Sequence, residues 1–139
     1  MKNQESITGS CLCGSVQFEV AGPFLEFNYC YCGRCRKAGG GAHSAHLFIE
    51  PAQLTWISGE SETAIFLHPM ADGYPRRFCT RCGSAVPRLA RDCKRMVVPA
   101  GTLDADPGCR PDKNLFWSLR APWVDCEHGL PTYGVRPGC

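Results

Sequence analysis

Residues 79–83, "CTRCG", place two cysteines three positions apart and follow the second with a glycine. Two thiolates on a tight turn can face one metal ion, while the backbone N–H groups beyond the first cysteine point at its sulfur. Gly83 supplies the permissive backbone that lets such a turn close. The stretch therefore has the form of a zinc knuckle, in which Cys79 and Cys82 supply two of the thiolates of a metal site.

Two further clusters of cysteines have ligand spacing, "CLCG" at residues 11–14 and "CYCGRC" at residues 30–35. In an extended strand residues 11 and 13 share a face, so a slight bend brings both sulfurs to one ion. Three such clusters in one short chain favour metal binding over the burial of seven small hydrophobic side chains. All-thiolate sites suit zinc or iron–sulfur clusters, and the glycine after each pair favours a zinc tetrahedron.

Counting the thiolates suggests how the seven cysteines divide. The two pairs make one closed four-thiolate site, and Cys30, Cys32 and Cys35 are left as a three-thiolate site with one position open. Counting alone leaves open the alternative in which one pair joins the triplet. His43 and His46 follow the triplet and are candidates for a fourth ligand, although a surface or strand histidine is the more common case.

The length and composition are those of one globular domain. The chain has 139 residues and 44% hydrophobic residues, enough for a real core, and we expect a single domain over residues 1–139. There is no apolar run near the ~20 residues that a membrane helix needs. The opening "MKNQESITGS" lacks the charged-then-apolar layout of a secretory signal. We therefore expect a cytoplasmic protein whose cysteines bind metal rather than form disulfides.

The charge of the chain gives no indication of a polyanionic partner. The formal charge is +2; two zinc ions would add four charges and seven thiolates would remove seven, which leaves about −1. A near-neutral protein is a poor electrostatic match for nucleic acid or for an anionic membrane. We expect neither as a partner.

Short stretches rich in β-formers recur along the chain, and glycines and prolines separate them. This pattern predicts a mainly β domain of short antiparallel strands. Helical turns are expected only around residues 33–38 and after Asp104. The expected strands lie within residues 15–20, 44–49, 53–58, 63–67, 85–90, 95–101 and 114–119.

Five stretches of the chain, taken in order, form a family-specific pattern. They are "GSCLCGSVQFEV" (9–20), "CYCGRCRKAGG" (30–40), "RRFCTRCGSAVP" (76–87), "AGTLD" (100–104) and "APW" followed by "GLPTY" (121–133). This order resembles the glutathione-dependent formaldehyde-activating enzyme family, which also includes centromere protein V. The resemblance spans about residues 8–133 and implies a β-tent fold organised around zinc-binding cysteine clusters.

The resemblance also assigns the cysteines to two zinc ions. It implies a structural zinc on Cys11, Cys13, Cys79 and Cys82, and a second, catalytic zinc on Cys30, Cys32 and Cys35. The implied activity is a carbon–sulfur lyase reaction in which glutathione and formaldehyde condense to S-hydroxymethylglutathione. Two positions depart from the family pattern, because Tyr31 and Asn114 stand where many members have histidine.

In the implied reaction, a zinc ion with three thiolate ligands and an open position could bind the substrate thiol. A free thiol has a pKa of about 8.5, whereas a thiol bound to zinc is deprotonated and held in place. Arg34, Arg36 and Lys37 surround Cys35. We take Arg34 and Lys37 as candidates to bind glutathione carboxylates, with solvated surface cations as the alternative. A non-catalytic zinc-binding interaction module of the same fold is the second functional hypothesis.

Overall fold

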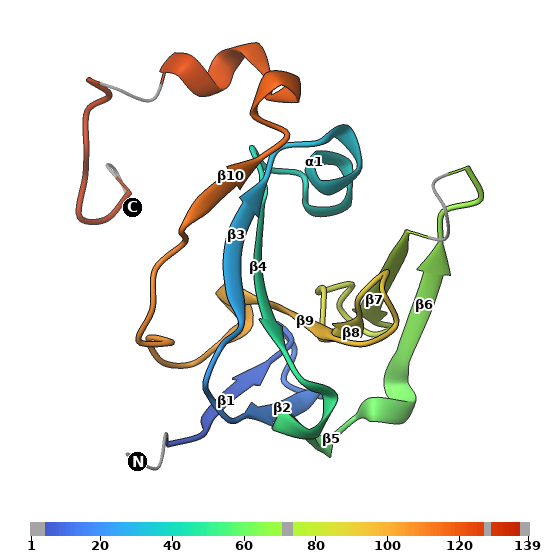
Figure 1. Ribbon diagram of the computed structural model, residues 1–139. Helices are drawn as coiled ribbons and strands as arrows, with labels where there is room; N and C mark the ends of the chain where they lie inside the picture. Colours follow the sequence, from blue (N-terminus) through green and yellow to red (C-terminus); the bar gives the residue numbers. More distant parts are fainter. Residues whose placement is uncertain (1–4, 71–73, 127–128, 137–139) are drawn as a thin grey trace.

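The computed structural model describes residues 5–70, 74–126 and 129–136, which form short strands, one α-helix and several 3-10 turns (Figure 1). The helices are α1 (Gly33–Gly39), η1 (Pro51–Gln53), η2 (Glu60–Glu62), η3 (Ala100–Thr102), η4 (Trp117–Leu119) and η5 (Pro122–Cys126). The strands are β1 (Ile7–Ser10), β2 (Gln17–Val20), β3 (Glu26–Cys30), β4 (Ser44–Ile49), β5 (Leu54–Ser58), β6 (Thr63–Leu67), β7 (Pro75–Cys79), β8 (Arg88–Leu89), β9 (Met96–Pro99) and β10 (Lys113–Leu115).

The strands form three sheets. One has the order β1-β2-β5, the second has the order β10-β3-β4-β9-β8, and β6 pairs with β7 alone. All the pairs are antiparallel except β10 with β3. In Figure 1, β3 and β4 run side by side through the middle, with α1 near one end and β1, β2 and β5 near the other. The mainly β architecture expected from the sequence is confirmed.

The core lies between the three-stranded and five-stranded sheets. Alternate side chains of β4 point into it, because successive residues of a strand face opposite sides. Burying one such aliphatic side chain contributes about 1.5–3 kcal/mol. The buried members of this core are Phe18, Val20, Leu47, Ile49, Met96 and Val98.

The other face of the five-stranded sheet carries the functional groups. Asn28 and Cys30 on β3, His46 on β4 and Val97 on β9 line one cleft there. They alternate with the core residues, so the same pairing register that builds the core also fixes the floor of the cleft.

Some local expectations were met and others were wrong. Helix α1 covers the expected turns at residues 33–38. No helix forms over residues 104–116, because the carboxylate of Asp106 accepts hydrogen bonds from the Gly108 N–H and from Arg110 and holds a turn instead. The expected strand 114–119 is cut short, since Phe116 has a φ of 55° and ends β10.

No helix in the described part of the chain is long and apolar enough to cross a bilayer.

Candidate functional site

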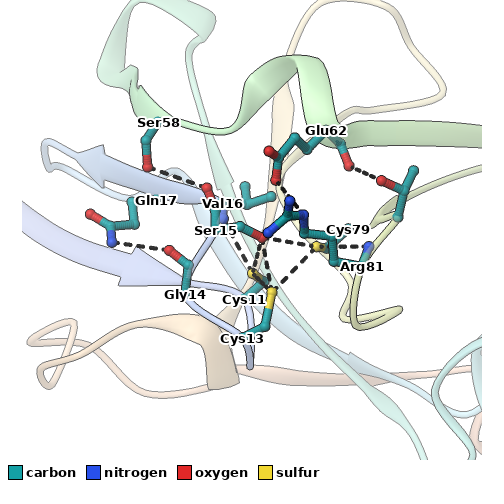
Figure 2. A network of polar contacts seen from close by, with 11 residues as sticks. Cys11, Cys13, Gly14, Ser15, Val16, Gln17, Ser58, Glu62, Cys79 and Arg81 are labelled. Atoms are coloured by element: carbon teal, nitrogen blue, oxygen red, sulfur yellow. Dashed lines mark hydrogen bonds and ion pairs between the residues drawn. The ribbon is translucent and has the colours of Figure 1, made fainter.

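The four-sulfur cluster consists of Cys11, Cys13, Cys79 and Cys82. Cys11 and Cys13 lie in the turn after β1, Cys79 ends β7, and Cys82 lies in the turn after it. All four sulfurs lie within 4.8 Å of one another. Figure 2 shows how residues 68 positions apart in the sequence, Cys11 and Cys79, converge on one point.

The spacing of these sulfurs fits a tetrahedral metal site. An ion bonded to four sulfurs at about 2.3 Å would hold them about 3.8 Å apart. The Sγ atoms of Cys11 and Cys13 are 3.6 Å apart, and those of Cys13 and Cys79 are 3.8 Å apart. The cluster can therefore hold a thiophilic ion with four protein ligands.

Backbone N–H groups support the sulfurs in both turns. The N–H of Val16 donates to the Sγ of Cys11 at 3.3 Å, and the N–H of Arg81 donates to the Sγ of Cys79 at 3.4 Å. Gly83 has a φ of 76°, the left-handed conformation that the second turn requires. N–H donors of this kind stabilise thiolate over thiol, which favours metal binding.

Two serines add hydroxyl groups to the cluster. The Oγ of Ser15 lies 2.9 Å from the Sγ of Cys13, and the Oγ of Ser84 lies 3.3 Å from the Sγ of Cys82. The hydrogen bond between the Cys82 and Ser84 side chains is the main reason that the pKa of Cys82 is lowered to about 5. Neither serine was predicted from the sequence, although each follows the cysteine-glycine pair of its turn.

The three-sulfur cluster consists of Cys30, Cys32 and Cys35. Cys30 ends β3, Cys32 caps the N-terminus of α1, and Cys35 lies in the first turn of that helix. All three are buried, and their sulfurs lie within 4.8 Å of one another. Among the residues that the structure describes, no histidine, cysteine or carboxylate joins them as a fourth member.

The local structure holds one of these thiols as a thiolate. The hydrogen bond from Cys30 lowers the pKa of Cys35 to about 4, and hydroxyl groups of Ser44 and Tyr74 contribute further. The same hydrogen bond raises the pKa of Cys30. The N–H of Cys35 also donates to the Sγ of Cys32 at 3.4 Å. The cluster thus provides the thiolate character that a metal ligand or a nucleophile requires.

A cleft of about 570 Å³ opens beside the three-sulfur cluster. This volume is within the range of small-molecule sites. Among the described residues, four arginines line the cleft and Asp92 is the one acidic residue with them, so this lining is basic. The lining arginines are Arg34, Arg88, Arg91 and Arg95.

Tyr74 connects this cleft to the cluster. Its hydroxyl lies 3.4 Å from the Sγ of Cys35, and burial raises the pKa of Tyr74, so the phenol stays neutral. The guanidinium groups of Arg34 and Arg88 lie over its ring, at 5.8 and 5.5 Å from the centroid. No local motif marks Tyr74 in the sequence, because it comes from the segment before β7.

The two residues proposed to bind substrate share a neighbouring apolar pocket, but only Arg34 also lines the cleft. Arg34 lines the cleft, whereas Lys37 is exposed and lines a neighbouring apolar pocket with Phe66. Arg36, the cation between them, does not line the cleft in the described structure.

The two candidate histidines also differ in position. His46 lines the cleft, and burial together with Arg88 lowers its pKa to about 4, so its imidazole is neutral. His43 instead stacks on Tyr29 with the ring centroids 4.0 Å apart. Neither belongs to the three-sulfur group.

The two positions that depart from the family pattern, Tyr31 and Asn114, make contacts outside the cleft. Tyr31 is buried and packs edge-on against Trp117 at 4.9 Å, and it also contacts His43. Asn114 is exposed on β10, opposite Tyr29 of β3. Neither residue lines the cleft.

Comparisons with known proteins agree with this arrangement. Residues 6–119 match the family described as "Glutathione-dependent formaldehyde-activating enzyme". A Halomonas elongata protein, provisionally named a glutathione-dependent formaldehyde-activating enzyme, is 34% identical over 128 residues, which cover 87% of this chain and 81% of that protein. A crystal structure of a Rhodobacter sphaeroides protein superposes with a TM-score of 0.60 at 21% identity, over 78% of this chain and 98% of that one. This last likeness concerns the fold.

Proposed function

The chain belongs to the glutathione-dependent formaldehyde-activating enzyme family, and from this premise we propose that it joins a thiol such as glutathione to an aldehyde at the three-sulfur cluster. The observation that carries the proposal is a buried group of three thiols that opens on a basic cleft. Three ligands leave room for an incoming group, whereas the four-sulfur cluster is complete and serves the fold.

The donor sets of the two clusters fit zinc in different roles. Cys11, Cys13, Cys79 and Cys82 would hold a structural ion, and Cys30, Cys32 and Cys35 would hold a second one. Zinc bound there would supply the positive charge that keeps an incoming thiol deprotonated and in place.

The reaction is an addition, and the cleft offers groups for each part of it. The sulfur forms a bond to the carbonyl carbon, the carbonyl electron pair moves to oxygen, and that oxygen takes up the proton lost by the thiol. The neutral hydroxyl of Tyr74 lies at the sulfurs, where it can donate a hydrogen bond to a developing negative charge. Arg34 offsets the charge of the thiolates. Phe48 and Leu115 form apolar parts of the wall.

The proposal is tested by the rate at which glutathione and ¹³C-formaldehyde exchange with S-hydroxymethylglutathione, measured by NMR exchange spectroscopy. We expect the zinc-loaded protein to accelerate this exchange and Cys32→Ser to abolish the acceleration. Cys93→Ser is the matched control, because Cys93 is exposed and outside both clusters. An exchange rate equal to the uncatalysed rate would refute the proposed reaction.

A second candidate function, a non-catalytic interaction module, is favoured by the segment that follows β10. Its apolar side chains are exposed to a degree that often marks a binding surface. This function would be favoured if the zinc-loaded protein stayed bound to a partner at physiological salt and left the exchange rate unchanged. The exposed residues are Phe116, Trp117, Leu119, Trp123, Leu130, Tyr133 and Val135.

A further inference from the structure

Arg88 lies beside the three-sulfur cluster without a carboxylate partner. It belongs to β8, is half-buried, and lines the cleft. Within the described residues no carboxylate oxygen comes within ion-pair distance of it. Its contacts are the ring of Tyr74 and the carbonyl of Leu89, to which Nη1 donates at 3.4 Å. A shielded guanidinium of this kind favours an anion as its partner.

Arg95, in the same cleft, differs from Arg88 because it has carboxylate partners. It donates to Asp92 at 2.8 Å and to Glu26 at 3.1 Å, so two carboxylates already compensate its charge. Arg88 has no carboxylate of this kind: burial lowers its pKa, and the neighbouring Tyr74 and Cys35 offset that effect only in part. Arg88 and Arg34, whose guanidinium groups both lie over the ring of Tyr74, therefore bring positive charge to the cleft that no carboxylate of the described residues pairs with.

The three-sulfur cluster does not neutralise both arginines. Three thiolates with one divalent ion carry a single net negative charge, against the two positive charges of Arg34 and Arg88. A positive charge remains for a ligand that brings an anionic group in addition to its sulfur. This balance favours a thiol that also carries a carboxylate.

Asn28 on the floor of the cleft indicates a second feature of the ligand. Asn28 is only 1% exposed, and its Nδ2 donates to Glu26 at 2.7 Å, which fixes the orientation of the amide. Its Oδ1 has no hydrogen-bond partner. A ligand with an amide N–H in the cleft would supply the missing donor.

The width of the sheet sets the size of the ligand. β3 and β8 are separated by β4 and β9, so their backbones lie about 14 Å apart at a spacing of about 4.8 Å per strand. Asn28 of β3 and Arg88 of β8 line the cleft at the two ends of this width. A tripeptide, about 10 Å long when extended, matches the remaining span.

We propose that Arg88 binds a carboxylate of the substrate, so that the site selects short peptide thiols with a free carboxylate over uncharged thiols. This inference rests on the proposed function, because it assumes that the thiol enters at the three-sulfur cluster. Arg88 is then the residue that determines substrate specificity, whereas the cysteines determine where the sulfur lies.

The test is isothermal titration calorimetry on the zinc-loaded protein with three probes. Glutathione has the thiol and both carboxylates, glutathione diethyl ester has only the thiol, and S-methylglutathione has only the carboxylates. Wild type should bind glutathione about 10-fold more tightly than the diester, the effect of one hydrogen-bonded ion pair. Arg88→Gln should weaken binding of glutathione and of S-methylglutathione about 10-fold and leave the diester unchanged.

Two further variants control this experiment. Arg110→Gln removes an exposed arginine that pairs with Asp106 outside the cleft, and it should change none of the three affinities. Arg88→Lys keeps the charge and should restore part of the preference for glutathione. Zinc content and circular dichroism establish that each variant is folded.

The possible results separate the two proposals. If wild type binds glutathione and its diester equally, the role of Arg88 is overturned while the proposed function stands, and this comparison needs no variant. If Arg88→Gln loses the diester as strongly as glutathione, Arg88 only supports the structure and the inference is wrong. If wild type binds none of the thiols, both proposals fail together.

Discussion

The hydroxyl of Tyr74 lies 3.4 Å from the Sγ of Cys35, although 38 residues separate the two in the chain. Cys35 sits in the first turn of α1, and Tyr74 directly precedes β7. The contact joins the three-sulfur cluster to the cleft and places a neutral hydrogen-bond donor at a thiolate. It therefore gives Tyr74 a defined role that a substitution can test.

Tyr74→Phe should slow the exchange of S-hydroxymethylglutathione about 10–100-fold. The substitution keeps the ring under Arg34 and Arg88 but removes one hydrogen bond to a charged group, which is worth about 1.5–3 kcal/mol. The zinc content should not change, because no ligand is lost. Tyr133→Phe, at an exposed tyrosine, is the control. An unchanged rate in Tyr74→Phe would show that the hydroxyl takes no part.

The two sulfur clusters should respond differently to loss of one cysteine. Cys79→Ser opens the complete cluster, where a structural zinc contributes about 10–16 kcal/mol, comparable to the stability of a whole domain. We expect this variant to be unfolded by circular dichroism. Cys32→Ser should keep the fold and lack one zinc by elemental analysis. Equal loss of structure in both variants would contradict this division between the clusters.

The sulfur clusters could be anticipated because the ligand spacing within each pair or triplet is local. Arg88 could not, since it reaches the cleft through pairing of β8 with β9 and of β9 with β4. The pairing of β9 with β4 joins segments about 50 residues apart, and the sequence near Arg88 does not indicate it. Tyr74 was missed for the same reason.

The strands that the sequence analysis missed contain the site itself. β7 reads "PRRFC" and β3 reads "EFNYC", and both mix charges, a cysteine and aromatic residues where a strand pattern would alternate. Tertiary contacts stabilise them instead: Arg77 of β7 lies over the ring of Trp56, and Asn28 of β3 bonds to Glu26. The functional residues of these strands thus break the alternation of apolar and polar residues from which a strand is predicted.

Glu26→Gln should reduce stability at neutral pH but not in acid. Burial alone would raise the pKa of Glu26, yet hydrogen bonds from Asn28 and Arg95 outweigh it and lower that pKa. A lowered pKa means that ionised Glu26 stabilises the fold above its unfolded pKa of about 4.3, and that this contribution is lost as the pH falls through the folded value.

Urea unfolding at several pH values measures this effect. At pH 7 the variant should be less stable by about 1–3 kcal/mol, the worth of hydrogen bonds to a charged group. The difference between the two proteins should shrink as the pH falls below about 4.3 and vanish once the pH lies below the lowered pKa of folded Glu26. Loss of zinc in acid affects both proteins, so their difference isolates Glu26. A difference independent of pH would assign the effect to packing rather than to charge.

Ser15→Ala should weaken metal retention at the four-sulfur cluster. The Ser15 hydroxyl lies 2.9 Å from the Sγ of Cys13 and 3.6 Å from that of Cys79, so it can donate to a thiolate ligand without binding the ion itself (Figure 2). Groups in this position typically change metal affinity 10–100-fold. Transfer of zinc to a coloured chelator should therefore be faster from Ser15→Ala than from wild type. Ser118→Ala, at an exposed serine in η4, should match wild type, and equal transfer from Ser15→Ala would show that the hydroxyl does not support the thiolates.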